Sequence, residues 1–105
     1  MNNTIAMKRF EIVVGIEQLE KLTELLDRCS VRGYTVLKNA GGLGSRGIRD
    51  PGDVLMEQEN VMVVLACKED QAQRVLDEIR PALKKLGGMC LISECQWVEG
   101  PAVSY

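Results

Sequence analysis

The apolar residues in the first half of the chain follow two different periods. Apolar and polar side chains alternate between about residues 8 and 14, which predicts a strand because successive strand residues face opposite sides of a sheet. Between residues 17 and 32 the apolar residues recur every three or four positions, which predicts an amphipathic helix. Gly33 stands where a helix-ending glycine is expected. The β-branched and aromatic residues 34–37 predict a second strand.

The second half of the chain repeats this order. Residues 61–67 (VMVVLAC) are apolar at every position, which predicts a strand buried on both faces. An amphipathic helix is expected from about residue 68 to Leu86, with Pro81 kinking it or ending it early. The glycines after Leu86 stop the helix, and residues 89–98 predict a fourth strand.

The order βαββαβ predicts an α+β fold of the ferredoxin-like class, in which two helices lie on one face of an antiparallel four-stranded sheet. We expect residues 1–105 to form one domain, with a long loop at about 40–58 after the second strand and a loose tail at about 99–105. Two helices cover one face of such a sheet, yet the strand at 61–67 is apolar on both. The other face therefore needs a partner, and we predict a homo-oligomer.

Composition argues against several classes of function. The net charge is −2, and the aromatic residues are one Trp, two Tyr and one Phe. Nucleic-acid binding, which needs clustered cations or stacked aromatic side chains, is therefore not expected. The sequence shows no secretory signal pattern and no apolar run near about 18 residues. We accordingly expect a cytoplasmic protein that is not itself a membrane protein.

Residue types that serve most catalytic and metal sites are scarce. The chain has no histidine, and its four cysteines form no C-x-x-C pair, so we predict no metal site and interpret the cysteines as small, reduced apolar residues. General acid–base or nucleophilic catalysis needs a histidine, an activated cysteine or a placed carboxylate pair. Glu57 and Glu59 lie near the long loop, and we interpret them as a solvated loop end. No catalytic residue is predicted, and we do not expect an enzyme.

The stretch 42–47 (GLGSRG) matches the G-x-G-x-x-G spacing of dinucleotide-binding folds. In those folds the motif follows a strand and opens a helix, whose N-terminus receives the phosphates. Here Pro51 and Gly52 come soon after the motif and predict a turn in place of a helix. We therefore reject the dinucleotide-fold interpretation.

The same stretch has the chemistry of an anion site. Its glycines would let successive backbone N–H groups form a concave nest, and its arginines suit bidentate pairing with phosphate or carbonate oxygens. The residues concerned are Gly41, Gly42, Gly44 and Gly47, with Ser45, Arg46 and Arg49. A mobile linker between two strands is the alternative that the residues leave open.

Residues 32–49 (RGYTVLKNAGGLGSRGIR) resemble the second strand and T-loop stem of the P-II signalling superfamily. The length, the βαββαβ order, the long loop after the second strand and residues 86–92 (LGGMCLI) agree with this. The pattern GG-x-GSR is most similar to that of carboxysome-associated P-II-like proteins and related bicarbonate-transporter regulators. The resemblance covers about residues 8–98.

Proteins of this superfamily are trimers that bind adenine nucleotides in clefts between subunits and contact a partner through the T-loop. The resemblance therefore implies a homotrimeric, non-enzymatic signalling protein of inorganic-carbon metabolism. Its partner would be a membrane transporter or a carboxysome-related protein that contacts residues 40–58. By position, the nucleotide site would comprise Thr35, Gly41, Gly42, Gly44, Ser45, Arg46, Leu65, Ala66, Cys67, Gly87, Gly88 and Met89.

The chain departs from classical P-II proteins at positions that concern the ligand. Met89 stands where they have a lysine that neutralises the terminal phosphates of ATP, and residues 99–101 (EGP) replace arginines. Each missing cation removes a charge-assisted contact of roughly 1.5–3 kcal/mol, so we expect AMP or ADP as the ligand. Ser45, Arg46 and Arg49 would then bind bicarbonate beside a short phosphate chain.

Two other functions stay open at this stage. A small phosphoryl hydrolase on the same fold would release phosphate from acyl phosphates or nucleotides. A metabolite- or cation-sensing trimer would share the architecture but would not need the stretch GGLGSR. Binding of adenine nucleotides without their hydrolysis would favour the signalling function over both.

Overall fold

The computed structural model describes residues 3–44, 47–49 and 59–100 of the chain. Six strands and two α-helices are found within these ranges, together with one short 3₁₀ helix. In chain order they are β1 (Thr4–Gly15), η1 (Ile16–Gln18), α1 (Leu19–Arg28), β2 (Thr35–Ala40), β3 (Gly42–Gly44), β4 (Gly47–Arg49), β5 (Asn60–Cys67), α2 (Glu69–Leu86) and β6 (Met89–Val98).

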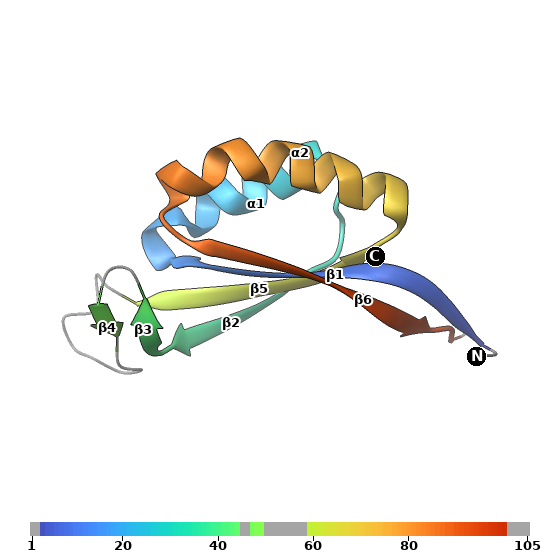
Figure 1. The fold of residues 1–105 in the computed structure, drawn as a ribbon, viewed down its shortest axis with the longest axis horizontal. Helices are drawn as coiled ribbons and strands as arrows, with labels where there is room; N and C mark the ends of the chain where they lie inside the picture. Colours follow the sequence, from blue (N-terminus) through green and yellow to red (C-terminus); the bar gives the residue numbers. More distant parts are fainter. Residues whose placement is uncertain (1–2, 45–46, 50–58, 101–105) are drawn as a thin grey trace.

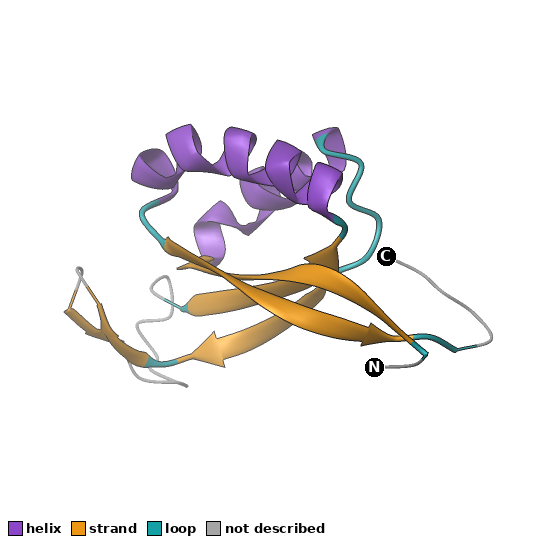
Figure 2. Cartoon of the chain, turned by 45° about the vertical axis from the view of Figure 1, so that its right-hand side comes forward, coloured by secondary structure: helices purple, strands orange, loops and turns teal. Residues whose placement is uncertain are grey.

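The main sheet has the strand order β2-β5-β1-β6, and each neighbouring pair is antiparallel. Both helices lie on one face of this sheet (Figures 1 and 2). The ferredoxin-like prediction is therefore confirmed. Neither helix in the described part of the chain is long and apolar enough to span a membrane.

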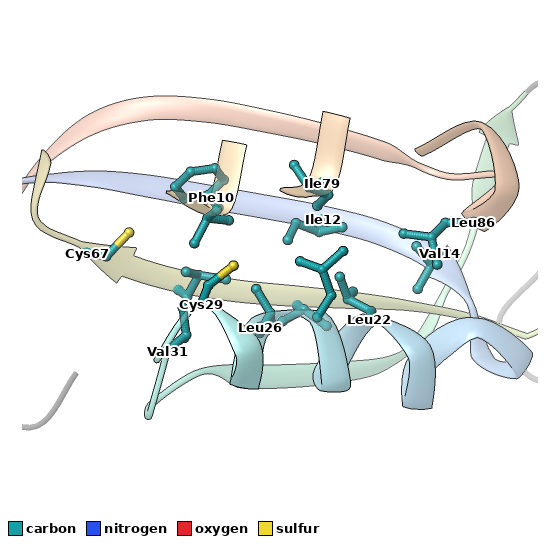
Figure 3. Close-up of a cluster of buried hydrophobic side chains, with 14 of the residues drawn as sticks. Phe10, Ile12, Val14, Leu22, Leu26, Cys29, Val31, Cys67, Ile79 and Leu86 are labelled. Carbon is teal, nitrogen blue, oxygen red and sulfur yellow. The ribbon is translucent and has the colours of Figure 1, made fainter. Parts of the chain in front are cut away.

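The core fills the space between the two helices and the sheet (Figure 3). Every second residue points into it from Phe10 to Val14 on β1 and from Val61 to Cys67 on β5, as the alternating pattern requires. The helices contribute side chains at three- and four-residue intervals. The largest fully buried side chains include Phe10, Ile12, Val14, Leu22, Leu26, Val61, Val63, Val75 and Ile79.

The opposite face of the sheet carries a row of apolar side chains across all four strands. Leu37, Met62, Val13 and Met89 are consecutive partners in the strand register, so their side chains lie on the same face. Leu37 is 47% exposed and Met89 is 49% exposed. The described elements leave this face without a covering layer in one protomer (Figure 2). We call it the open face.

Helix α1 ends earlier than the sequence predicted. It stops at Arg28, and the left-handed residue that turns the chain is Ser30, with φ of 62°, in place of the expected Gly33. The Ser30 N–H donates to the Asp27 carbonyl at 2.9 Å and the Val31 N–H to the Leu26 carbonyl at 3.0 Å, which is the Schellman pattern. The early turn lets Val31 join the core, where it is 6% exposed.

Helix α2 runs through Pro81 without interruption and ends at Leu86. The expectation that Pro81 ends the helix early is wrong. Proline removes the hydrogen bond to the carbonyl four residues before it, but Pro81 and Asp77 are both exposed, so water can solvate that carbonyl. The predicted glycine stop is confirmed, because Gly87 caps the helix with φ of 68°.

The long loop after β2 contains regular structure that its glycine-rich sequence did not predict. Strands β3 and β4 form a short antiparallel hairpin in which Gly42 pairs with Arg49 and Gly44 with Gly47. The hairpin projects from the end of the main sheet (Figure 1). A strand therefore follows the G-x-G-x-x-G spacing, in agreement with the rejection of the dinucleotide-fold interpretation.

Candidate functional site

The glycine-rich hairpin leaves the sheet at the end where β2 stops and β5 begins. Ala40 pairs with Asn60, and Asn60 pairs with Gly15 on β1. Gly88, in the turn between α2 and β6, lies against the same end of β1. We call this end, formed by Gly15, Ala40, Asn60 and Gly88, the stem end.

Two glycines at the stem end are required by the backbone itself. A β-carbon at Gly88 would lie 2.0 Å from the Val13 carbonyl oxygen and 2.8 Å from Val14 Cγ1, so a side chain cannot fit there without displacing β1. Gly87 occupies the left-handed region that L-residues rarely adopt. The close packing fixes the turn between α2 and β6 against β1, at the stem end of the sheet.

Glu59 connects three elements of the stem end. The register of β2 shifts between Leu37 and Ala40, where Asn39 has φ of 59°. The Asn39 N–H donates to the Glu59 carboxylate at 3.0 Å, and the Ile16 N–H donates to the Glu59 carbonyl at 2.7 Å. Glu59 remains partly exposed at the end of the loop, and its side chain in addition closes the bulge of β2. Glu57 lies outside the described residues.

The predicted nest of N–H groups is not formed by the described backbone. Gly42, Gly44 and Gly47 lie in the extended hairpin strands, and among the described glycines only Gly87 has a positive φ. A nest needs residues that alternate between right- and left-handed conformations. In the described strands of this hairpin, the backbone groups that could meet an anion are therefore in the extended conformation. Ser45 and Arg46 lie outside the described residues, and the description of Arg49 is limited to its backbone.

The remaining predicted residues lie at the opposite end of the sheet. Thr35, the first residue of β2, pairs with Val64, and β5 continues beyond this pair to Cys67. Leu65 and Cys67 are 3% and 1% exposed and point into the core, whereas Ala66 lies on the open face. We call this end, formed by Thr35 and residues 64–67, the exit end.

The two ends are too far apart for one mononucleotide to contact both within a protomer. Ala66 and Asn60 are six residues apart on β5, which corresponds to about 20 Å at the rise of a β-strand. The stem end holds Gly41, Gly87, Gly88, Met89 and the hairpin residues Gly42, Gly44 and Arg49, whereas the exit end holds Thr35, Leu65, Ala66 and Cys67.

The structure adds Arg9, which sequence reasoning did not select, to the exit end. Arg9 pairs with Ala66 in the strand register, so both side chains lie on the open face. Its guanidinium contacts the Glu11 carboxylate at 2.8 Å and remains 47% exposed. The sequence contained the information needed to place Arg9, because the alternation of residues 8–14 puts Arg9 on the face opposite Phe10.

A shallow cavity of about 230 Å³ opens near the beginning of α2, between this helix and strands β1 and β6. Lys8 Nζ lies there, 2.7 Å from Glu94 Oε1 and 3.7 Å from Glu69 Oε2. The hydrogen bond between Lys8 and Glu94 raises the pKa of Lys8 and lowers that of Glu94. The lining contains none of the residues predicted for the nucleotide, so this cavity is separate from that site.

The cysteines have the properties of core residues. Burial, together with the charge of Asp70, raises the pKa of Cys67 to about 11, and burial raises the pKa of Cys29 and Cys90. All four cysteines are free. These three thiols are protonated at neutral pH and are therefore poor nucleophiles. Within the described ranges, no three acidic or cysteine side chains are grouped closely enough to hold a metal ion.

The fold and the projecting hairpin define a small α+β protein of the P-II type. The model of the nitrogen regulatory protein P-II family matches residues 7–100, and the chain belongs to this family. A comparison with curated proteins found no significant match.

Solved structures of PII-like proteins share this architecture. CPII from Thiomonas intermedia K12, bound to ADP, AMP and bicarbonate, is 26% identical with a TM-score of 0.81, over 91% of this chain and 92% of that chain. CPII bound to ADP and bicarbonate is 29% identical with a TM-score of 0.79, over the same shares. A putative PII-like signalling protein from Thermus thermophilus is 26% identical with a TM-score of 0.75, over 91% of this chain and 93% of that one.

Proposed function

We propose that this protein is a homotrimeric, non-enzymatic signalling protein that binds AMP or ADP, together with bicarbonate, in clefts between protomers. The observation that carries the proposal is the separation of the stem end from the exit end by about 20 Å of strand. The residues that resemble a P-II nucleotide site are divided between these ends. The apolar row Leu37, Met62, Val13 and Met89 gives the open face the character of a subunit interface.

Each proposed cleft joins the stem end of one protomer to the exit end of its neighbour. The stem end contributes Gly41, Gly42, Gly44, Ser45, Arg46, Gly87, Gly88 and Met89 to the phosphates and ribose, and Ser45, Arg46 and Arg49 to bicarbonate. The exit end contributes Thr35, Leu65, Ala66 and Cys67 to the base. Because the side chains of Leu65 and Cys67 are buried in the core, these two residues contact the ligand through backbone groups.

Met89 favours the shorter nucleotides. Its thioether is uncharged and half exposed at the stem end, beside Gly88, where classical relatives have a cation. The γ-phosphate of ATP would therefore lack a charge-assisted partner at this position. CPII, which was solved with ADP, AMP and bicarbonate, supports this choice of ligands.

Calorimetry and thermal unfolding with AMP, ADP and ATP, each with and without bicarbonate, test the proposal. AMP or ADP at a hundred times its dissociation constant should stabilise the protein by about 2.7 kcal/mol, and bicarbonate should increase the affinity. Phosphate release from the nucleotides should stay at the level of a blank. If neither AMP nor ADP raises the melting temperature, the proposal is wrong.

Arg46→Ala tests the stem end. Loss of one charged hydrogen bond should weaken nucleotide or bicarbonate binding about 10- to 150-fold, from the roughly 1.5–3 kcal/mol of such a contact. Arg80→Ala, on the exposed surface of α2, is the matched control and should bind like the unmodified protein. Equal affinities of both variants would remove Arg46 from the site.

Mixing two variants tests whether each cleft combines the stem end of one protomer with the exit end of its neighbour. Arg46→Ala damages the stem end, and Ala66→Arg places a bulky charge at the exit end. Each variant alone should bind poorly, whereas trimers refolded from a mixture should regain part of the sites, because some clefts then combine two intact ends. Failure to regain any binding in confirmed mixed trimers would contradict a shared cleft.

We further propose that residues 40–58 contact a partner in inorganic-carbon metabolism, such as a cytoplasmically exposed bicarbonate transporter or a carboxysome-related protein. The hairpin projects from the sheet (Figure 1), which leaves it available to another protein. Capture of a candidate transporter should depend on AMP or ADP and should be lost when residues 42–58 are replaced by a short linker. Capture that is insensitive to both changes would exclude this role.

A further inference from the structure

Gln71, in the first turn of α2, holds the chain where it leaves α1. Its side-chain amide donates to the Ser30 carbonyl at 2.7 Å and to the Cys29 carbonyl at 3.5 Å. A weaker contact beside it runs from Cys29 Sγ to the Arg74 carbonyl at 3.7 Å. The beginning of the loop between α1 and β2 is therefore attached to the helix layer, above the exit end of the sheet.

The pairing of β2 with β5 stops short of this attachment. The register begins at Thr35 opposite Val64, and its continuation would place Tyr34 opposite Leu65 and Gly33 opposite Ala66. The loop instead rises from Thr35 toward Ser30. In the described structure, β1 is the strand that pairs with β5 beyond Val64, and the other edge of residues 65–67 carries no strand.

We propose that Gln71 is a positioning residue that keeps this edge of β5 open for the nucleotide. This inference rests on the proposed function and adds to it a residue that does not contact the ligand. Alternate backbone groups of a strand face each of its edges, so an open edge presents N–H and C=O groups to a planar base. Without Gln71, residues 33 and 34 can pair with Leu65 and Ala66 and occupy the same groups.

The local geometry explains why a side chain is needed for this task. Ser30 is a non-glycine residue in the left-handed region, which costs free energy and weakens the turn. The carbonyls of Cys29 and Ser30, on either side of this turn, both accept from the Gln71 amide. Because Gln71 is close in sequence to the end of β5, one side chain links both segments that border the exit end.

Gln71→Leu removes the donor while keeping a side chain of similar size. Gln73→Leu is the matched control, because Gln73 lies on the same helix and donates to Asp77 at 2.9 Å away from the loop. Gln71→Leu should weaken AMP and adenosine binding by the same factor, about fivefold for one lost hydrogen bond. Gln73→Leu should leave both affinities unchanged.

Hydrogen exchange of the ligand-free variants separates positioning from a merely structural role. In Gln71→Leu, the amides of residues 65–67 that face away from β1 should exchange about tenfold more slowly, because new pairing protects them. A general loss of stability would make the same amides exchange faster. Gln71→Ala provides a second variant with the same expectation if Gln71→Leu does not fold.

A failure of this inference can be distinguished from a failure of the proposed function. If the unmodified protein binds no adenine nucleotide, the proposed function fails. If it binds AMP but Gln71→Leu binds equally well, or if exchange at residues 65–67 is unchanged or faster, the role of Gln71 is refuted. Adding Ser30→Gly to Gln71→Leu should restore stability but not affinity, and recovery of both would also refute it.

Discussion

The carboxylate of Glu59 accepts a hydrogen bond from the backbone N–H of Asn39 at 3.0 Å, and these two residues border the two ends of the glycine-rich loop. The contact spans 20 positions in the sequence. It holds the chain together at the point where the loop leaves the sheet and returns to it. The two chain segments at the base of the loop are therefore joined by a specific hydrogen bond.

Loss of this contact should destabilise the protein. Glu59→Ala leaves the Asn39 N–H without its acceptor and should lower the free energy of unfolding by about 1 kcal/mol. Glu59→Gln keeps an acceptor oxygen at the same position and should lose less than half of that. Urea denaturation of both variants measures the difference. Equal stability of Glu59→Ala and the unmodified protein would show that the hydrogen bond contributes nothing.

Gly88→Ala should be among the most damaging small substitutions in the chain. The new methyl group would stand 2.0 Å from the Val13 carbonyl oxygen, so β1 or the turn before β6 must move, at a cost of about 1–3 kcal/mol or more. Gly100→Ala is the control, because nothing lies within 4 Å of its added β-carbon. Its stability should change by less than about 0.5 kcal/mol. Thermal unfolding compares the two variants.

Ser30→Gly should stabilise the protein. Ser30 holds the left-handed position of the Schellman turn, where glycine avoids a steric cost of roughly 1 kcal/mol. Part of that gain is offset by the greater entropy of glycine in the unfolded chain, so the net effect should be a few tenths to about 1 kcal/mol. Ser30→Ala should have the opposite sign. A destabilised Ser30→Gly would contradict the assigned turn geometry.

Cys67 should make stability fall at high pH. Burial raises its pKa from 9.0 to about 11, so between these values the folded state keeps a proton that the unfolded state has released. The stabilisation is complete below about pH 9 and is lost as pH rises toward 11. Cys67→Ser is expected to flatten this part of the pH profile. At pH 8, Cys67 should also resist alkylation until the protein unfolds.

Met89→Lys should shift the nucleotide preference toward ATP. A lysine at the stem end would supply the charge-assisted contact that the thioether lacks, and ATP affinity should rise by about tenfold or more. AMP affinity should change little, because AMP has no terminal phosphates to neutralise. Gln73→Lys, on the exposed surface of α2, is the charge-matched control. An unchanged ATP-to-AMP ratio in Met89→Lys would place Met89 away from the phosphates.

The sequence predicted the elements whose side chains repeat with a clear period. The buried alternation of β1 and β5 and the apolar stripes of both helices led directly to the ferredoxin-like order. The end of α1 could not be predicted in this way, because a serine replaces glycine at the left-handed position and burial of Val31 decides where the chain turns. The continuity of α2 depends on the solvent exposure of Pro81, which the sequence does not show.

The candidate site was less predictable because it depends on distance. The family resemblance grouped the glycines of the hairpin with Thr35 and Ala66, and the register of the sheet then placed them at opposite ends. The roles of Glu59 and Gln71 arise from single hydrogen bonds between segments 20 and 41 positions apart. The position of such a polar residue follows no sequence period, because its hydrogen-bond partner is a residue that only the tertiary structure brings close.

If the stem end of one protomer and the exit end of another share a nucleotide, ligand binding depends on the concentration of the protein itself. A nucleotide held by two protomers acts as a cross-link, so binding and subunit association are thermodynamically linked. Apparent affinity must then decrease when the protein is diluted below the concentration at which its protomers dissociate, and nucleotide must in turn hold dilute protomers together. The cellular abundance of the chain itself would thereby set the range of nucleotide concentration to which it responds.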